Sequence, residues 1–451
     1  MTVTQKRILK KTLAWLFWAA NGGVITAVWA VNSGPLLFSE DLGSALISLG
    51  RLAGLLATFS VVTQFVLMGR VGWLEPIFGL DKIAIFHRRN GVAALALIIA
   101  HPLLIVNGYA LLSGNDWVTQ YLQTLQSPFV PFALLAEILF VTSVVTSIYI
   151  VRKHFKFETW YAVHLISYIA IVSVVWHQLA NGAELQGSRE FSAYWIGLYL
   201  FIAANMLIWR FGKPLYSFWR HRFMVEKVVK ETDTATSVYI TGKHMDRFPA
   251  KAGQFVMVRF FTKELGWQEH PFSLSMVPNS QHLRLTIRQL GDFTNQVPFI
   301  KPGTPVMVSG PYGAFTHEQQ RQQKVLYIAG GVGITPIRAM IEERAKQSGG
   351  DAILLYGNRS VTDTIFLNEL TQLGHKISMP VHNVVSEESE YSGEKGYVDK
   401  DKIARLVPDI TERDIFLCGP PPMMAGVVAA LKQLGVPAAQ VHYERFSLHK
   451  G

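Results

Sequence analysis

Four histidines lie in two apolar stretches of the chain, where ionisable side chains are costly and are usually kept for a function. His87 and His101 are 14 residues apart in one stretch, and His164 and His177 are 13 residues apart in the other. On helices these spacings correspond to about 21 and 19.5 Å. If both helices cross a membrane in the same direction, His87 faces His164 and His101 faces His177. Facing imidazoles are the usual axial ligands of b-type haem, so the pattern predicts two haems.

The spacing in the second stretch predicts an irregular helix. At 100° per residue, 14 steps return to within ~40° of the starting face, whereas 13 steps miss it by ~140°. We therefore expect a kink, a tilt or a different approach by one histidine between His164 and His177. Two other polar residues in apolar runs leave alternatives open. Arg51 binds a haem propionate, polarises an acceptor or extends to the surface, and Glu137 serves a proton route or forms a structural hydrogen bond.

Six long apolar runs in residues 1–214 supply the helices that must position these histidines. Each run is near the ~20 residues that a helix needs to cross a bilayer. They cover about residues 13–32, 45–69, 83–106, 129–150, 160–180 and 192–211. The first run is too long for a cleavable signal and is followed by five more, so we expect a six-span transmembrane bundle.

Lysine and arginine are divided unevenly among the connecting loops. With the N-terminus inside, the inner segments hold 15 basic residues, whereas the outer loops 33–44, 107–128 and 181–191 hold only Arg189. The positive-inside rule then places the N-terminus and everything after the last span in the cytoplasm, at the plasma (inner) membrane.

The overall composition fits this division. The 451 residues are 50% apolar, and 42 Lys and Arg against 32 Asp and Glu give a net charge of +10. Residues 1–222 hold 17 basic and 9 acidic side chains, and residues 223–451 hold 25 and 23. The excess charge is thus mostly the inner-loop charge of the membrane half, which argues against a nucleic-acid partner. A single cysteine excludes a disulfide framework and a thiolate metal cluster.

Residues 215–320 change to short strand-like runs with glycine and proline turns, which predicts a small antiparallel β-barrel. We expect strands at Ser237–Thr241, Gln254–Phe261, Leu283–Gln289 and Pro305–Ser309.

Two motifs of this barrel suit a flavin nucleotide, although each alone is also compatible with an ordinary strand and turn. In the motif HPFSLS (270–275), a proline-fixed extended segment can place an aromatic ring and a hydroxyl along a flat ring edge. In the motif IRQLGDFT, Arg288 offers a forked donor to a pyrophosphate, Gly291 permits close backbone approach and Thr294 adds a hydroxyl.

Residues 321–451 alternate strands and helices, which predicts a Rossmann-like α/β domain. A strand at Lys324–Ala329 leads through the glycine-rich turn GGVGITP (330–336) into a helix at Ile337–Gln347. Such a turn before a helix binds phosphate through backbone N–H groups. A later strand leads into CGPPPMM (418–424).

Six motifs in order now resemble the ferredoxin-NADP reductase superfamily, in the branch fused to a haem-bearing membrane domain. They are HPFSLS, IRQLGDFT, GPYG (310–313), GGVGITP, LCGPPPMM and ERF (444–446). This branch comprises the NADPH oxidases and the ferric reductases, and with the paired histidines the resemblance covers nearly the whole chain. It implies a bacterial enzyme with a six-helix transmembrane bundle, an FAD-binding β-barrel and a Rossmann-like NAD(P)H domain.

The resemblance also implies roles at matching positions. The residues expected to hold the flavin ring are His270, Pro271, Phe272 and Ser273. Those expected at the FAD pyrophosphate are Arg288, Gly291 and Thr294. The nicotinamide nucleotide is expected at Gly330, Gly331, Gly333 and Thr335, and the nicotinamide itself beside Cys418, Gly419 and Pro420. The aromatic expected to cover the flavin is Phe446. We expect catalytic roles for Ser273, Cys418 and Phe446.

Two departures from the family pattern matter. The chain continues past Phe446 with Ser447–Gly451, which weakens the capping role. Ile105 stands where oxygen-reducing members often carry a further histidine, which weakens the oxygen-reduction hypothesis. Arg359 and Ser360 come just after the strand expected at Ala352–Tyr356. A basic residue with a hydroxyl at this end of the strand favours the 2′-phosphate of NADPH over NADH.

The resulting hypothesis is an enzyme that moves electrons from cytoplasmic NADPH through FAD and the two haems to an external acceptor. Ferric iron is slightly favoured over oxygen, which would make the protein a superoxide-producing NADPH oxidase. A hypothesis of another class is an electron-relay subunit that docks an external redox protein. A transporter that uses the six spans as a pore would leave the histidine pairs and the flavin motifs unexplained.

Overall fold

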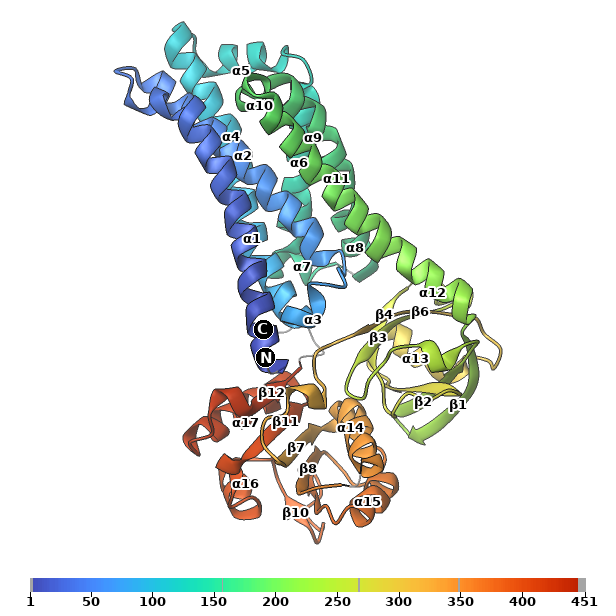
Figure 1. Ribbon diagram of the computed structural model, residues 1–451. Coiled ribbons are helices and arrows are strands. Elements are labelled where there is room, and N and C mark those ends of the chain that lie inside the picture. Colours follow the sequence, from blue (N-terminus) through green and yellow to red (C-terminus); the bar gives the residue numbers. More distant parts are fainter. Residues whose placement is uncertain (1–2, 156, 267, 348, 445–451) are drawn as a thin grey trace. The chain divides into compact units, whose positions relative to one another are not determined.

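The computed structural model describes residues 3–155, 157–266, 268–347 and 349–444 (Figure 1). The chain forms two compact units. One is helical and consists of Arg7–Leu74 and Lys82–Arg210. The other, called the soluble unit below, contains Glu75–Asp81 and the chain from Phe211 onward. A short segment between two long helices therefore belongs to the soluble unit.

Long apolar helices make up the first unit. They are α1 (Val3–Asn32), α2 (Leu42–Met68), α4 (Leu80–Ser113), α6 (Val130–Ser147), α8 (Phe157–Leu165), α9 (Ser167–Asn181) and α11 (Arg189–Asn205). Short helices connect them: η1 (Gly34–Phe38), α3 (Glu75–Phe78), α5 (Trp117–Leu125), α7 (Tyr149–Arg152) and α10 (Ala183–Gly187). The last long helix continues through η2 (Met206–Gly212) into α12 (Lys213–His221).

Among the described residues, 6 helical stretches are long and apolar enough to cross a membrane. They are Ile8–Asn32, Leu42–Met68, Lys82–Ser113, Val130–Ser147, Thr159–Asn181 and Arg189–His221. This confirms the six long apolar helices expected from the sequence.

Small residues bring these helices together. Ala94, Ala136 and Ala170, from α4, α6 and α9, are buried in one cluster. A Cβ added to Gly43 of α2 would lie 2.7 Å from the carbonyl oxygen of Gly108 in α4, so these two backbones touch. Close backbone approach through small residues is the usual way in which helices associate inside a membrane.

The expected irregularity between His164 and His177 is confirmed. The helix is interrupted at Ile166, where α8 ends and α9 begins. In α4, the helix that carries the other two histidines, Pro102 directly follows His101. Proline cannot donate the next intrahelical hydrogen bond, which makes this turn a weak point of the helix.

The FAD-type half of the soluble unit has two three-stranded antiparallel sheets. The first has the order β1 (Met224–Thr232), β2 (Ala235–Thr241), β5 (His282–Arg288), and the second β4 (His270–Ser273), β3 (Phe255–Phe260), β6 (Val306–Tyr312). Bridges from Met224 to Pro305 and from Leu274 to Leu285 join the two sheets. The four expected strands are present, and β1 and β4 complete the barrel.

The nucleotide-binding half has a six-stranded parallel sheet in the order β10-β9-β8-β7-β11-β12. Its strands are β7 (Lys324–Gly330), β8 (Ala352–Asn358), β9 (Val381–Val385), β10 (Glu394–Lys395), β11 (Arg413–Cys418) and β12 (Val441–Tyr443). Its helices are α14 (Ile334–Lys346), α15 (Leu367–Lys376), α16 (Lys400–Leu406) and α17 (Pro421–Gln433).

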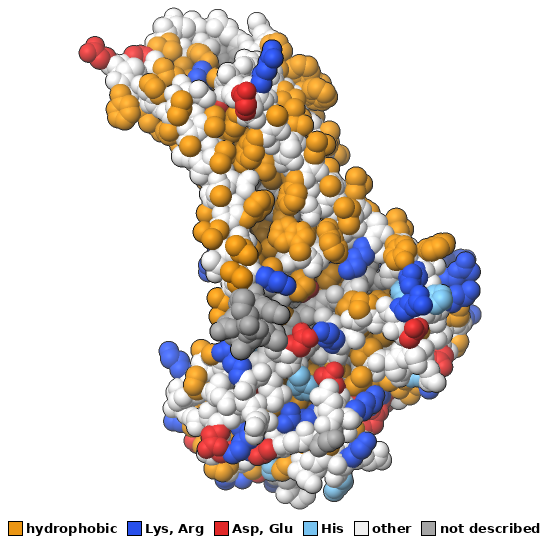
Figure 2. Space-filling view, viewed as in Figure 1, with side chains coloured by type: hydrophobic (Ala, Val, Ile, Leu, Met, Phe, Trp, Pro, Cys, Tyr) orange, Lys and Arg blue, Asp and Glu red, His pale blue; other side chains and the backbone are white. Residues whose placement is uncertain are grey.

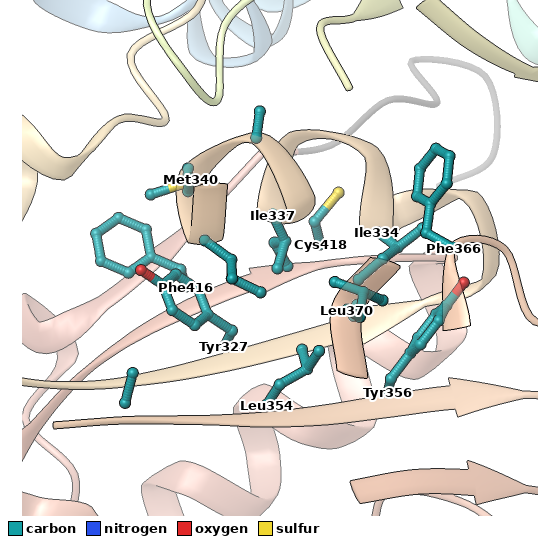
Figure 3. Packing of buried hydrophobic residues seen from close by; sticks show 14 of the residues in the cluster. Tyr327, Ile334, Ile337, Met340, Leu354, Tyr356, Phe366, Leu370, Phe416 and Cys418 are labelled. Carbon is teal, nitrogen blue, oxygen red and sulfur yellow. The ribbon is translucent and has the colours of Figure 1, made fainter. Parts of the chain in front are cut away.

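One core of this half lies between the sheet and α14 (Figure 3), and a second packs the sheet against α16 and α17. Tyr327, Leu354 and Phe416 rise from three neighbouring strands toward Ile337 of the helix. The strand order reverses beside β7, and ligands of such sheets bind where the order reverses. The helix expected from Ile337 begins three residues earlier, because Pro336 is tolerated in a first turn.

Candidate functional site

The structure brings the four membrane histidines together in the two expected pairs. The ring centroids of His87 and His164 are 6.1 Å apart, and those of His101 and His177 are 6.3 Å apart. A metal ion held between two imidazoles lies about 2.0–2.1 Å from each nitrogen, which places the two ring centroids ~6.3 Å apart. The two imidazoles of each pair are therefore close enough that they would hold one iron ion between them.

Neighbouring groups fix the orientation of two of these rings. Nδ1 of His101 lies 2.8 Å from the carbonyl oxygen of Gly50 and must donate to it, which leaves Nε2 as the ligand atom. Nδ1 of His164 lies 3.0 Å from the hydroxyl of Ser143 and 3.2 Å from that of Ser147. Outer hydrogen bonds of this kind set the tautomer and direction of metal-binding histidines.

Glycine makes room for the His101 ring on α2. A Cβ added to Gly54 would lie 2.7 Å from Nδ1 and 2.9 Å from Cε1 of His101, so only glycine allows this approach. The His164 ring is stacked on Trp160 at 5.4 Å.

The His87 ring has an unfilled hydrogen-bonding position. Its backbone carbonyl accepts from Gln64, but within the described part of the chain its buried Nδ1 has no hydrogen-bond partner. The described residues contain no cluster of three or more His, Cys, Asp or Glu side chains that could hold a metal ion. The two pairs of imidazoles are the groups that would hold a haem iron here.

A buried polar cluster surrounds Arg51, one residue after the carbonyl that accepts from His101. Nη1 of Arg51 donates to the Ser33 hydroxyl at 3.0 Å, and Ser33 in turn bonds to Glu184, whose residue is only 2% exposed. The hydroxyl of Ser48 donates to the Ser33 carbonyl at 2.6 Å. Sequence reasoning singled out Arg51 but missed Ser33 and Glu184, which are 151 residues apart in the chain.

The expected flavin-ring residues lie together on β4. The His270 ring is 3.9 Å from the Phe293 ring, and Phe272 is stacked on the same ring at 6.1 Å. Ser273 ends the strand and is buried, whereas Pro271 is exposed. Phe293, a residue that the sequence analysis did not single out, therefore organises this motif.

The Thr294 hydroxyl is engaged in a local turn. It accepts from the backbone N–H groups of Leu290 and Gly291, at 2.8 and 3.0 Å, and so closes the turn before α13 (Asp292–Gln296). Its observed contacts are structural, and they shape the loop in which Gly291 lies.

Arg288 reaches from the barrel to the nucleotide-binding half. Its guanidinium pairs with Asp363, and the Thr234 hydroxyl donates to the other Asp363 oxygen at 2.6 Å. A Cβ on Gly331 would lie 3.1 Å from Nη1 of Arg288. A forked cation thus stands beside the glycine-rich turn, where an anionic pyrophosphate is expected.

Glycines let two turns pack together at the carboxyl edge of the parallel sheet. A Cβ on Gly330 would lie 2.2 Å from the Met423 sulfur, and one on Gly333 would lie 2.4 Å from the Cys418 carbonyl. A Cβ on Gly419 would lie 3.2 Å from the Cα of Gly330. Gly331 has a φ of +52°, in the left-handed region that glycine favours.

Thr335 and Cys418 are both packed inside this edge. The Thr335 hydroxyl donates to the Val332 carbonyl at 3.0 Å. Cys418 is fully buried beside Ile334 and Ile337 (Figure 3). Burial, reinforced by the charge of Glu444, raises the pKa of the Cys418 thiol, which stays protonated. Pro420, after the same strand, is exposed.

Arg359 stands in a loop with acidic neighbours. Its guanidinium is 75% exposed and lies 3.6 Å from Glu387, while Glu388 accepts from the Val361 N–H at 2.8 Å. The Ser360 hydroxyl accepts from the Asp363 N–H at 3.2 Å. Both glutamates lie in the loop after β9, a part of the chain distant from the strand end that carries Arg359. Phe446 lies outside the described residues.

Segment 75–81 also contributes to the soluble unit. A buried Glu75 carboxylate accepts from the backbone N–H of Gly313 at 2.7 Å. Leu80 packs against the cluster of Phe255, Met257 and Tyr312 on β3 and β6. The sequence gives no local signal for this contact, which joins residues 238 positions apart.

Three family descriptions match successive parts of the chain. Residues 53–175 match a ferric reductase-like transmembrane component, residues 222–316 an FAD-binding domain and residues 327–429 an oxidoreductase NAD-binding domain.

Characterised relatives cover about half of the chain. Flavohemoprotein A of Dictyostelium discoideum is 27% identical over 56% of this chain and 68% of its own length. The ferredoxin reductase component of 3-ketosteroid-9-alpha-monooxygenase from Rhodococcus rhodochrous is 30% identical over 50% of this chain and 65% of its own length. The chain thus spans about two thirds of these relatives.

Two solved structures align with different shares of the chain. The flavohem-like FAD/NAD binding domain of nitric oxide dioxygenase from Vibrio cholerae aligns with 49% of this chain and 97% of its own, at 24% identity and a TM-score of 0.44. Flavohemoglobin from Malassezia yamatoensis aligns with 92% and 99%, at 18% identity and a TM-score of 0.49.

Proposed function

We propose that this chain, a member of the NADPH oxidase and ferric reductase superfamily, reduces an acceptor across the membrane with electrons from cytoplasmic NADPH. The family membership follows from its ferric reductase-like transmembrane, FAD-binding and NAD-binding domains. Members are transmembrane NAD(P)H-dependent flavin oxidoreductases. The acceptor that we favour is ferric iron. Bound FAD and two b-type haems would supply the conversion of a two-electron donor into single electrons and their transfer across the bilayer.

The observation that carries this proposal is the geometry of the two histidine pairs. The ring centroids of the two imidazole pairs are 6.1 and 6.3 Å apart, and both pairs are drawn from the same two helical stretches, so each pair would be able to hold one iron. His87 and His164 would hold the inner haem, and His101 and His177 the outer one.

The chain's own residues would position these groups. The Gly50 carbonyl holds the His101 ring in one tautomer, and the hydroxyls of Ser143 and Ser147 hold the direction of the His164 ring. In the soluble half, the motif around His270 would hold the flavin ring, and Arg288 would move from Asp363 to a pyrophosphate. The uneven loop charges support a cytoplasmic location for this half.

The choice of ferric iron rests on the surroundings of the outer pair. Ile105, one turn beyond His101, lies within 2.9 Å of a Cβ built on Gly50, so its side chain packs against α2. An apolar side chain there offers no proton to reduced oxygen. Arg51, which is partly exposed and is linked through Ser33 to the buried Glu184, would supply a cation that suits the carboxylates of a ferric chelate.

The test is NADPH oxidation by the purified full chain under argon and under air, with and without a ferric chelate. Superoxide dismutase is present throughout, because superoxide itself reduces ferric chelates. We expect rapid oxidation under argon only when the chelate is added, and slow oxidation in air without it. Rapid oxidation in air without iron would establish oxygen as the acceptor. Slow turnover with both acceptors would favour a relay to an external redox protein.

A further inference from the structure

Helix α12 presents an outward apolar face. Leu215, Tyr216 and Trp219 are 58%, 54% and 69% exposed, whereas Pro214 and His221 on the opposite face are buried. The inner face packs on the barrel at β6. Hydrophobic and basic side chains lie together at this end of the soluble unit (Figure 2). So much exposed aromatic surface on a short helix calls for a partner.

Basic residues border this apolar face. At 100° per residue, the order around the helix is Leu215, Trp219, Tyr216, Arg220 and Lys213, spread over about 160°. Arg220 is tied to the ring beside it by a 2.7 Å hydrogen bond to the Tyr216 hydroxyl. An apolar strip with Trp and Tyr, edged by Lys and Arg, is the pattern of helices that lie in the lipid headgroup layer.

The charge along this stretch has one sign. From residue 191 to residue 225 the chain contains no Asp or Glu, while Arg210, Lys213, Arg220 and Arg222 are present. A partner that complements this stretch is therefore anionic.

The place of this helix in the chain favours lipid as that partner. Helix α12 follows directly on the last long apolar helix and belongs to the helical stretch Arg189–His221, which has 33 residues. About 20 residues are enough for a helix to cross the hydrocarbon of a bilayer, so the remaining ~13 residues, which include α12, lie close along the chain to a membrane surface.

A hollow beside α12 could receive part of a lipid. Its volume is about 350 Å³, and its lining is almost wholly apolar. Phe218, Trp219, Phe223, Met224 and Pro305 form most of the lining, and the exposed Arg222 is the one charged residue on it. An acyl chain against the aromatic rings and a phosphate at the guanidinium satisfy both parts of this lining.

We propose that α12 and the adjoining hollow bind an anionic phospholipid of the cytoplasmic leaflet. The proposal goes beyond electron transfer and uses only the cytoplasmic placement of the soluble half from the proposed function. Arg220 and Arg222 hold the phosphate, and Trp219 lies among the upper acyl-chain carbons. Each basic residue near an anionic surface favours such lipids on the order of five-fold.

The test uses the full chain in lipid nanodiscs that contain phosphatidylglycerol or phosphatidylcholine with brominated acyl chains at equal mole fractions. Bromine quenches nearby tryptophan, and the difference between the wild type and Trp219→Phe isolates the Trp219 emission. We expect at least two-fold stronger quenching of this emission by the brominated phosphatidylglycerol. The double variant Arg220→Gln, Arg222→Gln should lose the preference.

The matched control is Lys400→Gln, Lys432→Gln, which removes the same charge from exposed residues of the nucleotide-binding half. This variant should keep the lipid preference. Equal quenching by both lipids, no quenching by either, or a preference that survives in the arginine variant overturns the proposal. Haem and flavin contents, measured on every sample, report folding. The readout needs no turnover, so its failure leaves the electron-transfer proposal standing, and inactivity with NADPH leaves this one standing.

Discussion

The substitution Gly54→Ala tests the outer haem site, because it adds a single methyl group beside one histidine. In Gly54→Ala, the new Cβ would lie 2.7 Å from Nδ1 of His101, whereas ordinary contact begins at 3.4 Å. Either the His101 ring or α2 must move by about 0.7 Å, the difference between these two distances. Ligand distances at a metal are tolerated within about 0.2 Å. The displacement therefore exceeds what the outer pair can absorb, and we expect this variant to lose the outer haem alone.

The assay counts haem and flavin per chain in the purified variant and follows the haem spectrum in a redox titration. We expect haem to fall from two per chain to one, with flavin unchanged. The component that disappears should be the one missing in His101→Leu, and the remaining one should be missing in His87→Leu. The matched control is Gly197→Ala in α11, where an added Cβ has nothing within 4 Å. Two haems with unchanged midpoint potentials in Gly54→Ala would refute the assignment of His101 as an axial ligand.

Three further predictions concern other parts of the chain. Ser143→Ala should weaken inner-haem binding by about 10-fold or more, measured by haem loss to apomyoglobin, because a ring-orienting hydrogen bond is removed. Arg359→Ala should lower kcat/KM for NADPH by about 10–100-fold and that for NADH much less, whereas Glu387→Gln should raise the NADPH value; equal effects on both nucleotides would contradict the 2′-phosphate role. The hydrogen bond from Arg413 lowers the pKa of Asp409 to about 2, so its stabilising contribution is fully present above the ordinary value of 3.8 and is lost as pH falls through about 2. The difference in melting temperature between the wild type and Asp409→Asn should therefore be constant above pH ~4 and shrink below it.

Regular periodicity explains why the membrane half was predictable. The spans follow from runs of apolar residues, and the interruption at Ile166 follows from a spacing of 13 residues between His164 and His177. Both are local properties of the chain. The pairing of His87 with His164 also needs only equal depth on two helices, which residue numbers supply.

Contacts between distant residues could not be predicted in the same way. The Ser33–Glu184 bond and the position of Glu387 beside Arg359 depend on how helices pack and on which strands are neighbours. Sequence motifs also did not show that Cys418 is sealed within the core or that the Thr294 hydroxyl closes a turn. In each case the residue type allows several partners, and tertiary packing selects one.

The contact between Glu75 and Gly313 has a consequence for how such chains can be divided or recombined. A fragment that starts at residue 211 would lack the carboxylate that accepts from Gly313 and the Leu80 side chain that covers Phe255 and Tyr312. The soluble unit is therefore not formed by one continuous stretch of the chain. An exchange of this unit between relatives would have to carry the seven-residue connection Glu75–Asp81 with it, so these two separated segments are expected to be inherited together.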